Sequence, residues 1–174
     1  QFTDRDFQSI QQLGDSLKKG KTGRFGIGFN SVYHVSELPH FFSAGKVVFF
    51  DPQARYLPNV NPSNPGKLVR ATDAIVNEYP NQFSCLPGFP DGNGTVFRLP
   101  LRTQKQAQVS KLSARPHPVE AVERLLNDFE RQAPEMLVFL KSVTTIQING
   151  KKVAEKKGDE INGESWVIVQ RSDG

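Results

Sequence analysis

The sequence predicts an α+β fold, a two-layer sandwich in which an antiparallel or mixed sheet carries helices on one face. Short apolar runs bounded by turn residues indicate strands, and one longer segment repeats apolar residues at helical spacing. The length of 174 residues, with 37% hydrophobic content, suits one soluble core. We therefore expect residues 1–174 to form a single domain.

Two strands are predicted in the first two thirds of the chain. The segment GKVVFFDP, residues 45–52, is a short apolar run, and NGTVFRLPLR, residues 93–102, is a second. The segment between them, PNVNPSNPGK at residues 58–67, is rich in Asn and Pro and is expected to be a loop.

Residues 111–174 are predicted to form a helix followed by a β-meander. The helix is expected from Pro118 to Gln132, with Pro134 ending it. Its apolar stripe is expected to face the core, with a partner-binding groove as the alternative; the stripe comprises Val119, Val122, Leu125, Leu126 and Phe129. Asn149-Gly150 predicts a hairpin turn, and residues 164–172 supply a third strand.

Composition argues against several classes of protein. The net charge of +4, from 22 Lys and Arg against 18 Asp and Glu, is too mild to indicate nucleic-acid binding. No apolar run approaches the ~20 residues of a membrane span. The lone Cys85 forms no internal disulfide, which favours a reducing, cytoplasmic location. The three His residues are isolated from one another and from Cys85, so no metal site is expected.

The glycine-rich stretch from Lys18 to His34 allows two interpretations. Gly20-Lys21-Thr22 matches the end of the triphosphatase loop G-x-x-x-x-G-K-[ST], but the first glycine should fall at position 15, which is Asp15. The residues ahead of it also show helical spacing, whereas that loop must follow a buried strand. The first interpretation is therefore disfavoured.

The second interpretation uses Gly23, Gly26 and Gly28, in the order G-x-x-G-x-G, ahead of a short apolar helix. A helix start directs free N–H groups at an anion, and glycines let a phosphate approach the backbone. The alternative is a glycine-rich turn that serves only tight helix packing.

The stretch TGRFGIGFNSVYH, residues 22–34, resembles the second glycine box of the GHKL ATPase superfamily, which includes the ninety-kilodalton heat-shock chaperone. Arg24 and the FNSVYH ending are similar to sacsin and its relatives. Three further stretches agree in order and spacing, namely residues 2–13, 47–67 and 93–113.

The resemblance implies a role for each part of the chain. Residues 1–22 would be a lid, 23–36 the phosphate loop and its helix, and 94–102 the strand of the last box. ATP with magnesium would be the cofactor in the complete module. The implied nucleotide-binding residues are Gly23, Arg24, Phe25, Gly26, Ile27, Gly28, Phe29 and Thr95. Arg24 stands where the heat-shock chaperone has Gln, so a cation there either pairs with the phosphates or occupies their place.

No catalytic residue is assigned within this chain. In active relatives the Glu that activates water, the Asn that holds magnesium and the Asp that binds adenine all precede the lid, so we expect them upstream of Gln1 in a longer protein. Glu37 is interpreted as a helix-end or loop carboxylate and Asp51 as a strand exit. Arg98 and Arg102 are expected to be solvated, with an acidic partner as the alternative.

Two functions remain open. In the first, the chain is part of an ATP-binding, chaperone-related module with a nucleotide-gated lid, and it is an ATPase only if the upstream residues exist. In the second, it is an inactive structural or protein-interaction module that keeps the fold. The expected partners are a nucleotide, other domains of the same large protein and chaperone clients, without nucleic acid or membrane.

Overall fold

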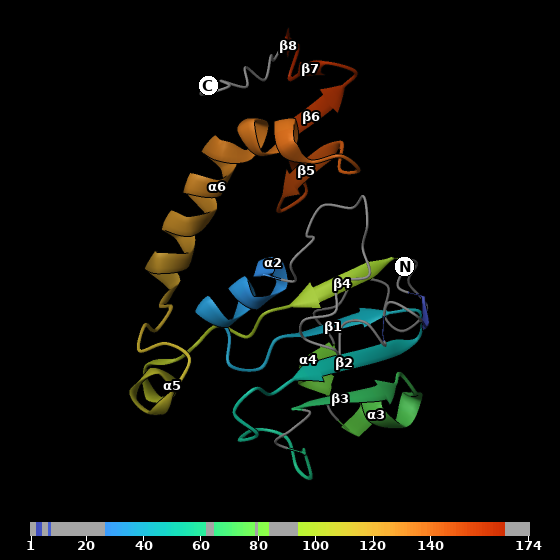
Figure 1. Ribbon diagram of the computed structural model, residues 1–174, viewed down its shortest axis with the longest axis vertical. Coiled ribbons are helices and arrows are strands. Elements are labelled where there is room, and N and C mark those ends of the chain that lie inside the picture. Colours follow the sequence, from blue (N-terminus) through green and yellow to red (C-terminus); the bar gives the residue numbers. More distant parts are fainter. Residues whose placement is uncertain are drawn as a thin grey trace, which may run out of the picture. The chain divides into compact units, whose positions relative to one another are not determined.

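The structure, a computed structural model, describes residues 3, 4, 7, 27–61, 65–78, 80–83 and 94–165. The chain divides into two compact units, unit 1 from Gln1 to His117 and unit 2 from Pro118 to Gly174. Each unit combines helices with antiparallel strands (Figure 1), which confirms the predicted α+β class. The assignment of a single domain stays a prediction.

Unit 1 is built on a four-stranded sheet with the order β3-β2-β1-β4, in which all neighbours are antiparallel. Its strands are β1 (His40–Ser43), β2 (Lys46–Phe50), β3 (Gly66–Arg70) and β4 (Thr95–Arg98). The predicted strands correspond to β2 and β4. The sequence pattern missed β1 and β3, and β3 begins inside the segment that was expected to be a loop.

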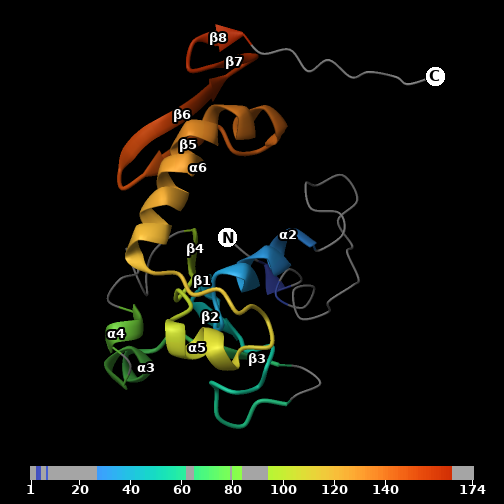
Figure 2. The same cartoon turned by 90° about the vertical axis from the view of Figure 1, so that its left-hand side faces the viewer.

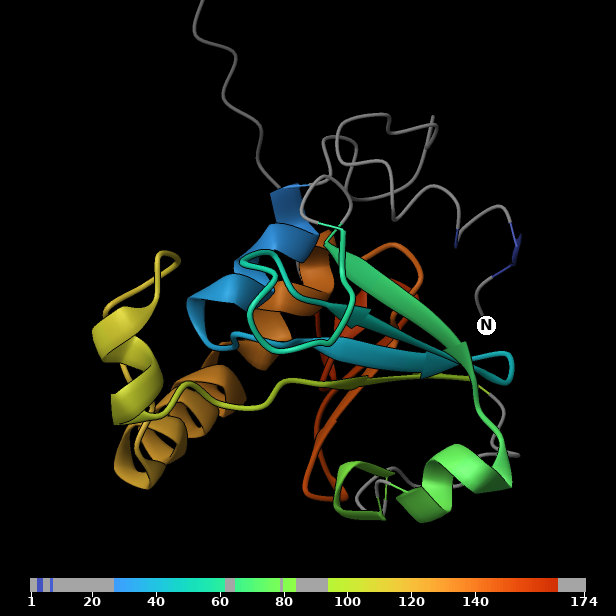
Figure 3. The same cartoon turned by 90° about the horizontal axis from the view of Figure 1, so that it is seen from below.

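Both faces of this sheet are covered by packed side chains. Neighbouring residues of one strand contribute to opposite faces, because successive side chains alternate. Phe41 packs with Phe7 and Phe50 on one face, where the helical turns α2 (Ile27–Asn30) and η1 (Ser31–His34) also lie. Phe42 packs with Phe83 on the other face. Phe83 belongs to α4 (Pro80–Phe83), which follows α3 (Asp73–Glu78). Figure 3 shows α2 and α4 on opposite sides of the sheet. Helices therefore lie on two faces rather than on one.

A short helix, α5 (Gln104–Val109), follows β4 and was not predicted. It begins with a capping box: the Thr103 hydroxyl accepts from the Gln106 N–H at 3.2 Å, and the Gln106 side chain accepts from the Thr103 N–H at 2.8 Å. The T-x-x-Q spelling is a recognised helix start, so the sequence did contain this signal.

Unit 2 contains the long helix α6 (Val119–Phe139). The start was predicted at Pro118, and the structure begins the helix one residue later with Pro118 as its N-cap. The predicted end at Gln132, before Pro134, is wrong, because the helix continues past this proline for another turn. Proline gives up one backbone hydrogen bond. Burial of Ala133 and Leu137 against Ala154 and Ile161 favours continuation despite that loss. The helix changes direction in its C-terminal part (Figures 1 and 2), as expected near an internal proline.

The predicted core stripe of this helix is wrong for three of its five residues. Val119, Leu125 and Leu126 are 69%, 52% and 39% exposed, whereas Val122 and Phe129 are half-buried. The buried contacts lie in the C-terminal half, beyond the predicted end. No described helix, including α6, is long and apolar enough to cross a membrane.

The meander of unit 2 has the order β5-β6-β7-β8. Its strands are β5 (Thr145–Ile148), β6 (Lys151–Lys157), β7 (Glu160–Ile161) and β8 (Glu164–Ser165). The predicted hairpin is confirmed: Ile148 pairs with Lys151, and both Asn149 and Gly150 have positive φ, as a two-residue turn requires. The third predicted strand begins as β8, and residues beyond 165 lie outside the described part of the chain.

Candidate functional site

The helix that follows the glycine box is anchored to the sheet by one aromatic side chain. The Phe29 ring lies 4.7 Å from the Phe50 ring of β2 and 6.3 Å from the Phe97 ring of β4, measured between centroids. Tyr33 packs edge-on against Phe29 at 6.4 Å. These contacts fix α2 over the face of the sheet that also carries Phe41.

The structure describes only part of the predicted phosphate loop. Gly23, Arg24, Phe25 and Gly26 lie outside the described residues, while Ile27, Gly28 and Phe29 form the start of α2. Gly28 is exposed, and a Cβ built on it would meet no described atom within 4 Å. Packing within the described residues therefore does not require a glycine at this position.

Thr95, the other predicted binding residue, opens β4 and pairs with Ser43 at the end of β1. Their hydroxyl oxygens are 2.8 Å apart, and the Ser43 hydroxyl also donates to the Gly94 carbonyl at 3.2 Å. The pairing register places Thr95 and Phe97 on the same face of β4, since they are two residues apart. Phe97 contacts Phe29, so the half-buried Thr95 faces the same layer.

The beginning of the predicted lid also lies on this face. Phe7 is buried and stacks on Phe41 with centroids 5.9 Å apart. Lys46 of β2 contacts two residues at the beginning of the lid. Its ammonium group lies 2.5 Å from the Asp4 carboxylate and 4.9 Å from the centre of the Phe7 ring. The rest of the lid, apart from Thr3, is outside the described residues.

A buried ion pair that was not predicted joins the loop after η1 to the residues that follow β4. Glu37 and Arg102 are 1% and 0% exposed. Glu37 does lie in the loop after η1, as predicted, but its burial was not expected, and the prediction of a solvated Arg102 is wrong. Arg102 Nε and the Ser110 hydroxyl donate to one Glu37 oxygen, the latter at 2.7 Å. The Gln53 amide donates to the other oxygen, where the Tyr56 hydroxyl also approaches to 3.5 Å.

The other donors of Arg102 bind backbone carbonyls from two separate segments. Its two terminal nitrogens donate to the Tyr33 carbonyl at 2.6 Å and to the His34 carbonyl at 2.7 Å, at the end of η1. Nη1 also approaches the Arg115 carbonyl at 3.3 Å. A buried guanidinium needs this degree of compensation, because an unpaired buried charge is costly.

Asp51 is buried and acts as a structural carboxylate at the end of β2. Its two oxygens accept from the N–H groups of Arg55, Tyr56 and Leu57 at 3.1, 2.7 and 2.9 Å. This organises the loop that carries Gln53 and Tyr56 to Glu37. Its position at a strand exit agrees with the sequence interpretation.

The opposite face of the sheet carries a buried histidine. His40 Nδ1 lies 3.0 Å from the Leu38 carbonyl, and the half-buried Arg98 directs Nη1 at His40 Nε2 from 3.3 Å. Burial lowers the pKa of His40 to about 4; the bond to Leu38 opposes this shift and the charge of Arg98 adds to it. The ring is therefore neutral at pH 7, with Nδ1 donating and Nε2 accepting. Arg98 is thus engaged with a side chain rather than simply solvated.

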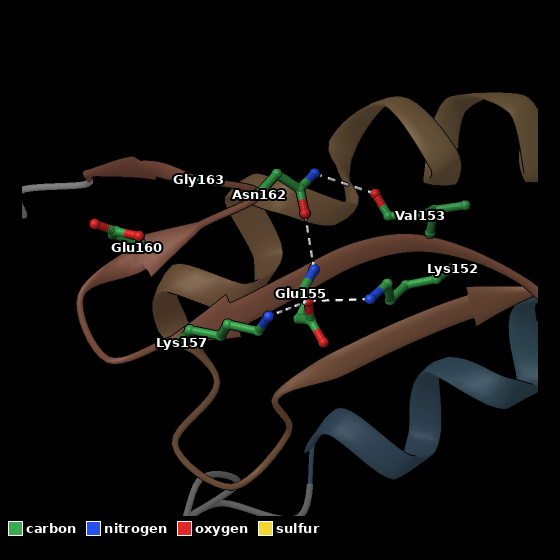
Figure 4. A pocket seen from close by; sticks show the side chains of 7 residues that line it. All are labelled: Lys152, Val153, Glu155, Lys157, Glu160, Asn162 and Gly163. Atoms are coloured by element: carbon green, nitrogen blue, oxygen red, sulfur yellow. Dashed lines mark hydrogen bonds and ion pairs between the residues drawn. The ribbon is translucent and has the colours of Figure 1, made fainter.

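Unit 2 has a shallow polar groove between β6 and the β7–β8 turn (Figure 4), with Lys152 and Lys157 among the residues that line it. Their ammonium groups lie 3.0 and 3.3 Å from Glu155, and hydrogen bonds from both lysines lower the pKa of that carboxyl. The Asn162 side-chain amide accepts a hydrogen bond from the Glu155 N–H and donates one to the Val153 carbonyl, both in β6. These polar groups satisfy one another and indicate no ligand.

The fold and site together define an α+β module in which a glycine-rich segment enters a helix packed on an antiparallel sheet. The family model of the Sacsin domain matches residues 1–162. Sacsin from Homo sapiens is 34% identical over 191 residues, covering 99% of this chain and 4% of the human protein's length. The chain belongs to the Sacsin domain family.

Proposed function

We propose that this chain is the phosphate-loop and lid part of an ATP-binding, chaperone-related module within a large sacsin-like protein. The observation that carries the proposal is the contact of Phe29 with Phe97. Through this contact, the helix after the glycine box lies over the strand that begins with Thr95. Phosphate-binding and adenine-binding ends of one nucleotide site require this proximity.

The geometry of Gly28 supports a ligand role for the glycine box. No described atom lies within 4 Å of the position a Cβ would take on Gly28, and a phosphate would need such space in order to reach the backbone of α2 closely. The turns α2 and η1 are short, so affinity must come largely from the loop amides that precede them and from the rest of the nucleotide.

Thr95 offers a hydroxyl whose hydrogen bonding is already directed. Ser43 has one hydroxyl proton, and the Gly94 carbonyl accepts it. Thr95 then donates to Ser43, and its own oxygen keeps a lone pair for an adenine amino group or a bound water. The side chain would be oriented before the nucleotide arrives.

Under this proposal the lid closes over the nucleotide from an anchored end. Phe7 fixes its beginning on the sheet, and ATP would hold the lid over the glycine box. Hydrolysis releases it and biases the conformation of a client-binding region elsewhere in the large protein. The general base, the magnesium ligand and the adenine-binding carboxylate would be supplied by sequence that precedes the lid.

The test is calorimetry with magnesium-ATP on this chain and on a version extended upstream by about a hundred residues, the scale of a complete domain. We expect weak binding without turnover by the shorter chain and clear binding by the longer one. Thr95→Val keeps the branched shape but removes the hydroxyl and should weaken binding, whereas Thr95→Ser should retain it. If neither length binds, the structural or protein-interaction function replaces the nucleotide-binding one.

A further inference from the structure

We propose that Arg102 is a positioning residue that couples the phosphate-loop helix to the segment leading into unit 2. The inference deepens the proposed function and rests on it for the nucleotide, but its contacts exist without one. Arg102 touches neither the glycine box nor Thr95 in the described residues. It acts through the carbonyl groups that it holds.

The first half of the coupling lies at the end of the phosphate-loop helix. The residues that follow the glycine box run through α2 and η1 to Tyr33 and His34, whose carbonyls both accept from Arg102. The Arg102 N–H also donates to the Val35 carbonyl at 2.8 Å. A shift of this helix along its axis would therefore have to move the guanidinium or break its bonds.

The second half lies in the last residues of unit 1. The His117 N–H donates to the Arg102 carbonyl at 2.8 Å, and the Arg115 carbonyl approaches the guanidinium. The His117 ring adds a direct link, with Nε2 3.1 Å from the His34 carbonyl. Pro118, the next residue, begins unit 2.

The guanidinium suits this role because it is planar and carries its donors in a fixed arrangement. One rigid group thus holds carbonyls of Tyr33, His34 and Arg115 at set distances from one another. Glu37 keeps the group in place by its charge, and both partners are shielded from water. A lysine could retain the charge, but its single nitrogen could not serve both segments in this geometry.

The experiment compares amide hydrogen exchange in the full-length protein and in its Arg102→Lys variant, with and without magnesium-ATP. The reporters are the amides of Val35 and Ser36, which donate to the Val32 carbonyl, and the amide of His117. Without nucleotide, the variant should exchange roughly threefold to tenfold faster at both places, the effect of about one hydrogen bond. Arg55→Gln is the matched control, because it removes an exposed arginine's bond to the Val109 carbonyl and leaves Glu37 untouched.

Magnesium-ATP should change exchange at His117 in the wild type, and Arg102→Lys should abolish that response while the protein stays folded. Faster exchange at the helix end alone, or an equal effect of Arg55→Gln, overturns the proposal. ATP binding that leaves His117 unchanged also overturns it, while the proposed function stands. If ATP does not bind, the proposed function fails, and the nucleotide-free comparison alone decides the coupling.

A second variant acts from the other side and covers the case in which Arg102→Lys does not fold. His117→Ala removes only the ring contact with His34, near the surface. Because the ring is one of the links between the two segments, its loss should accelerate exchange at Val35 and Ser36. Unchanged exchange at both amides would refute the coupling.

Discussion

Unit 1 contains an ion pair in its interior, whereas the ion pairs of unit 2 within the described residues lie on its surface. Glu37 and Arg102 are shielded from water, while Arg131 and Asp128 on α6 are largely exposed. The apolar contacts differ as well, because the sheet of unit 1 is packed on both faces and α6 contacts its sheet mainly through its C-terminal half. The comparison shows that charge defines the interior geometry of unit 1 and contributes little to that of unit 2.

The largest effect is expected from Arg102→Met, which leaves Glu37 buried without its cation. Breaking one partner of a buried pair costs about 3 to 5 kcal/mol of the free energy of unfolding. Arg131→Met is the same substitution at an exposed pair and should change that free energy little. Urea denaturation of both variants measures the difference, and equal losses would contradict the contrast between the units.

Within α6, Leu137→Ala should cost about 2 to 5 kcal/mol, because the side chain is fully buried and its removal leaves a cavity. Leu126→Ala changes a side chain that is already partly in water and should cost about 1 kcal/mol or less. Thermal and urea unfolding check both values. A larger loss for Leu126 would show that the N-terminal half of the helix has a buried partner.

His40 makes unit 1 sensitive to acid. Its folded pKa of about 4 lies below its ordinary value of 6.5, so the unfolded chain takes up a proton that the folded one refuses. Stability from this group is complete above pH 6.5 and is lost as the pH falls toward 4, by about 3 kcal/mol in total. Urea denaturation between pH 7 and 4 should show a shallower pH slope for His40→Gln than for the wild type. Parallel slopes would exclude this role.

The smallest effect is expected from Gly28→Ala, which should change the free energy of unfolding and the affinity for ATP in opposite directions. Gly28→Ala should raise the free energy of unfolding by about 0.4 to 1 kcal/mol, because it restricts the unfolded chain and its methyl group meets no atom of the described residues in the folded one. The same methyl group should weaken magnesium-ATP binding by the upstream-extended chain. Calorimetry and urea unfolding of one preparation test both parts, and unchanged ATP affinity would remove Gly28 from the proposed site.

Local signals in the sequence predicted local structure. Asn149-Gly150 sets a two-residue turn by itself, and the apolar run of β2 needs only its own residues to be identified. Thr95 was correctly placed at the start of a strand. Most of the predicted glycine box lies outside the described residues, so the phosphate-binding role of Gly23 and Gly26 stays a prediction.

The missed features depend on residues far apart in the chain. Glu37 and Arg102 are separated by 65 positions, and each belongs to a residue type that is mostly exposed, so neither neighbourhood indicates burial. Pro134 was interpreted as a helix end because proline disrupts helices locally, whereas packing of Leu137 on unit 2's sheet favours continuation. Tertiary contacts decided both cases.

The hydrogen bond between the His117 N–H and the Arg102 carbonyl also makes unit 1 a convenient host for inserted sequence. This hydrogen bond joins the two ends of the segment formed by residues 103–116, so the segment is a closed loop. Extra residues at the exposed Ala114 would lengthen a loop that is already closed, and doubling such a loop costs only about 0.6 kcal/mol in closure entropy. An epitope or a fluorescent reporter inserted there would report on the chain beside the buried ion pair and would leave the bond between His117 and Arg102 in place.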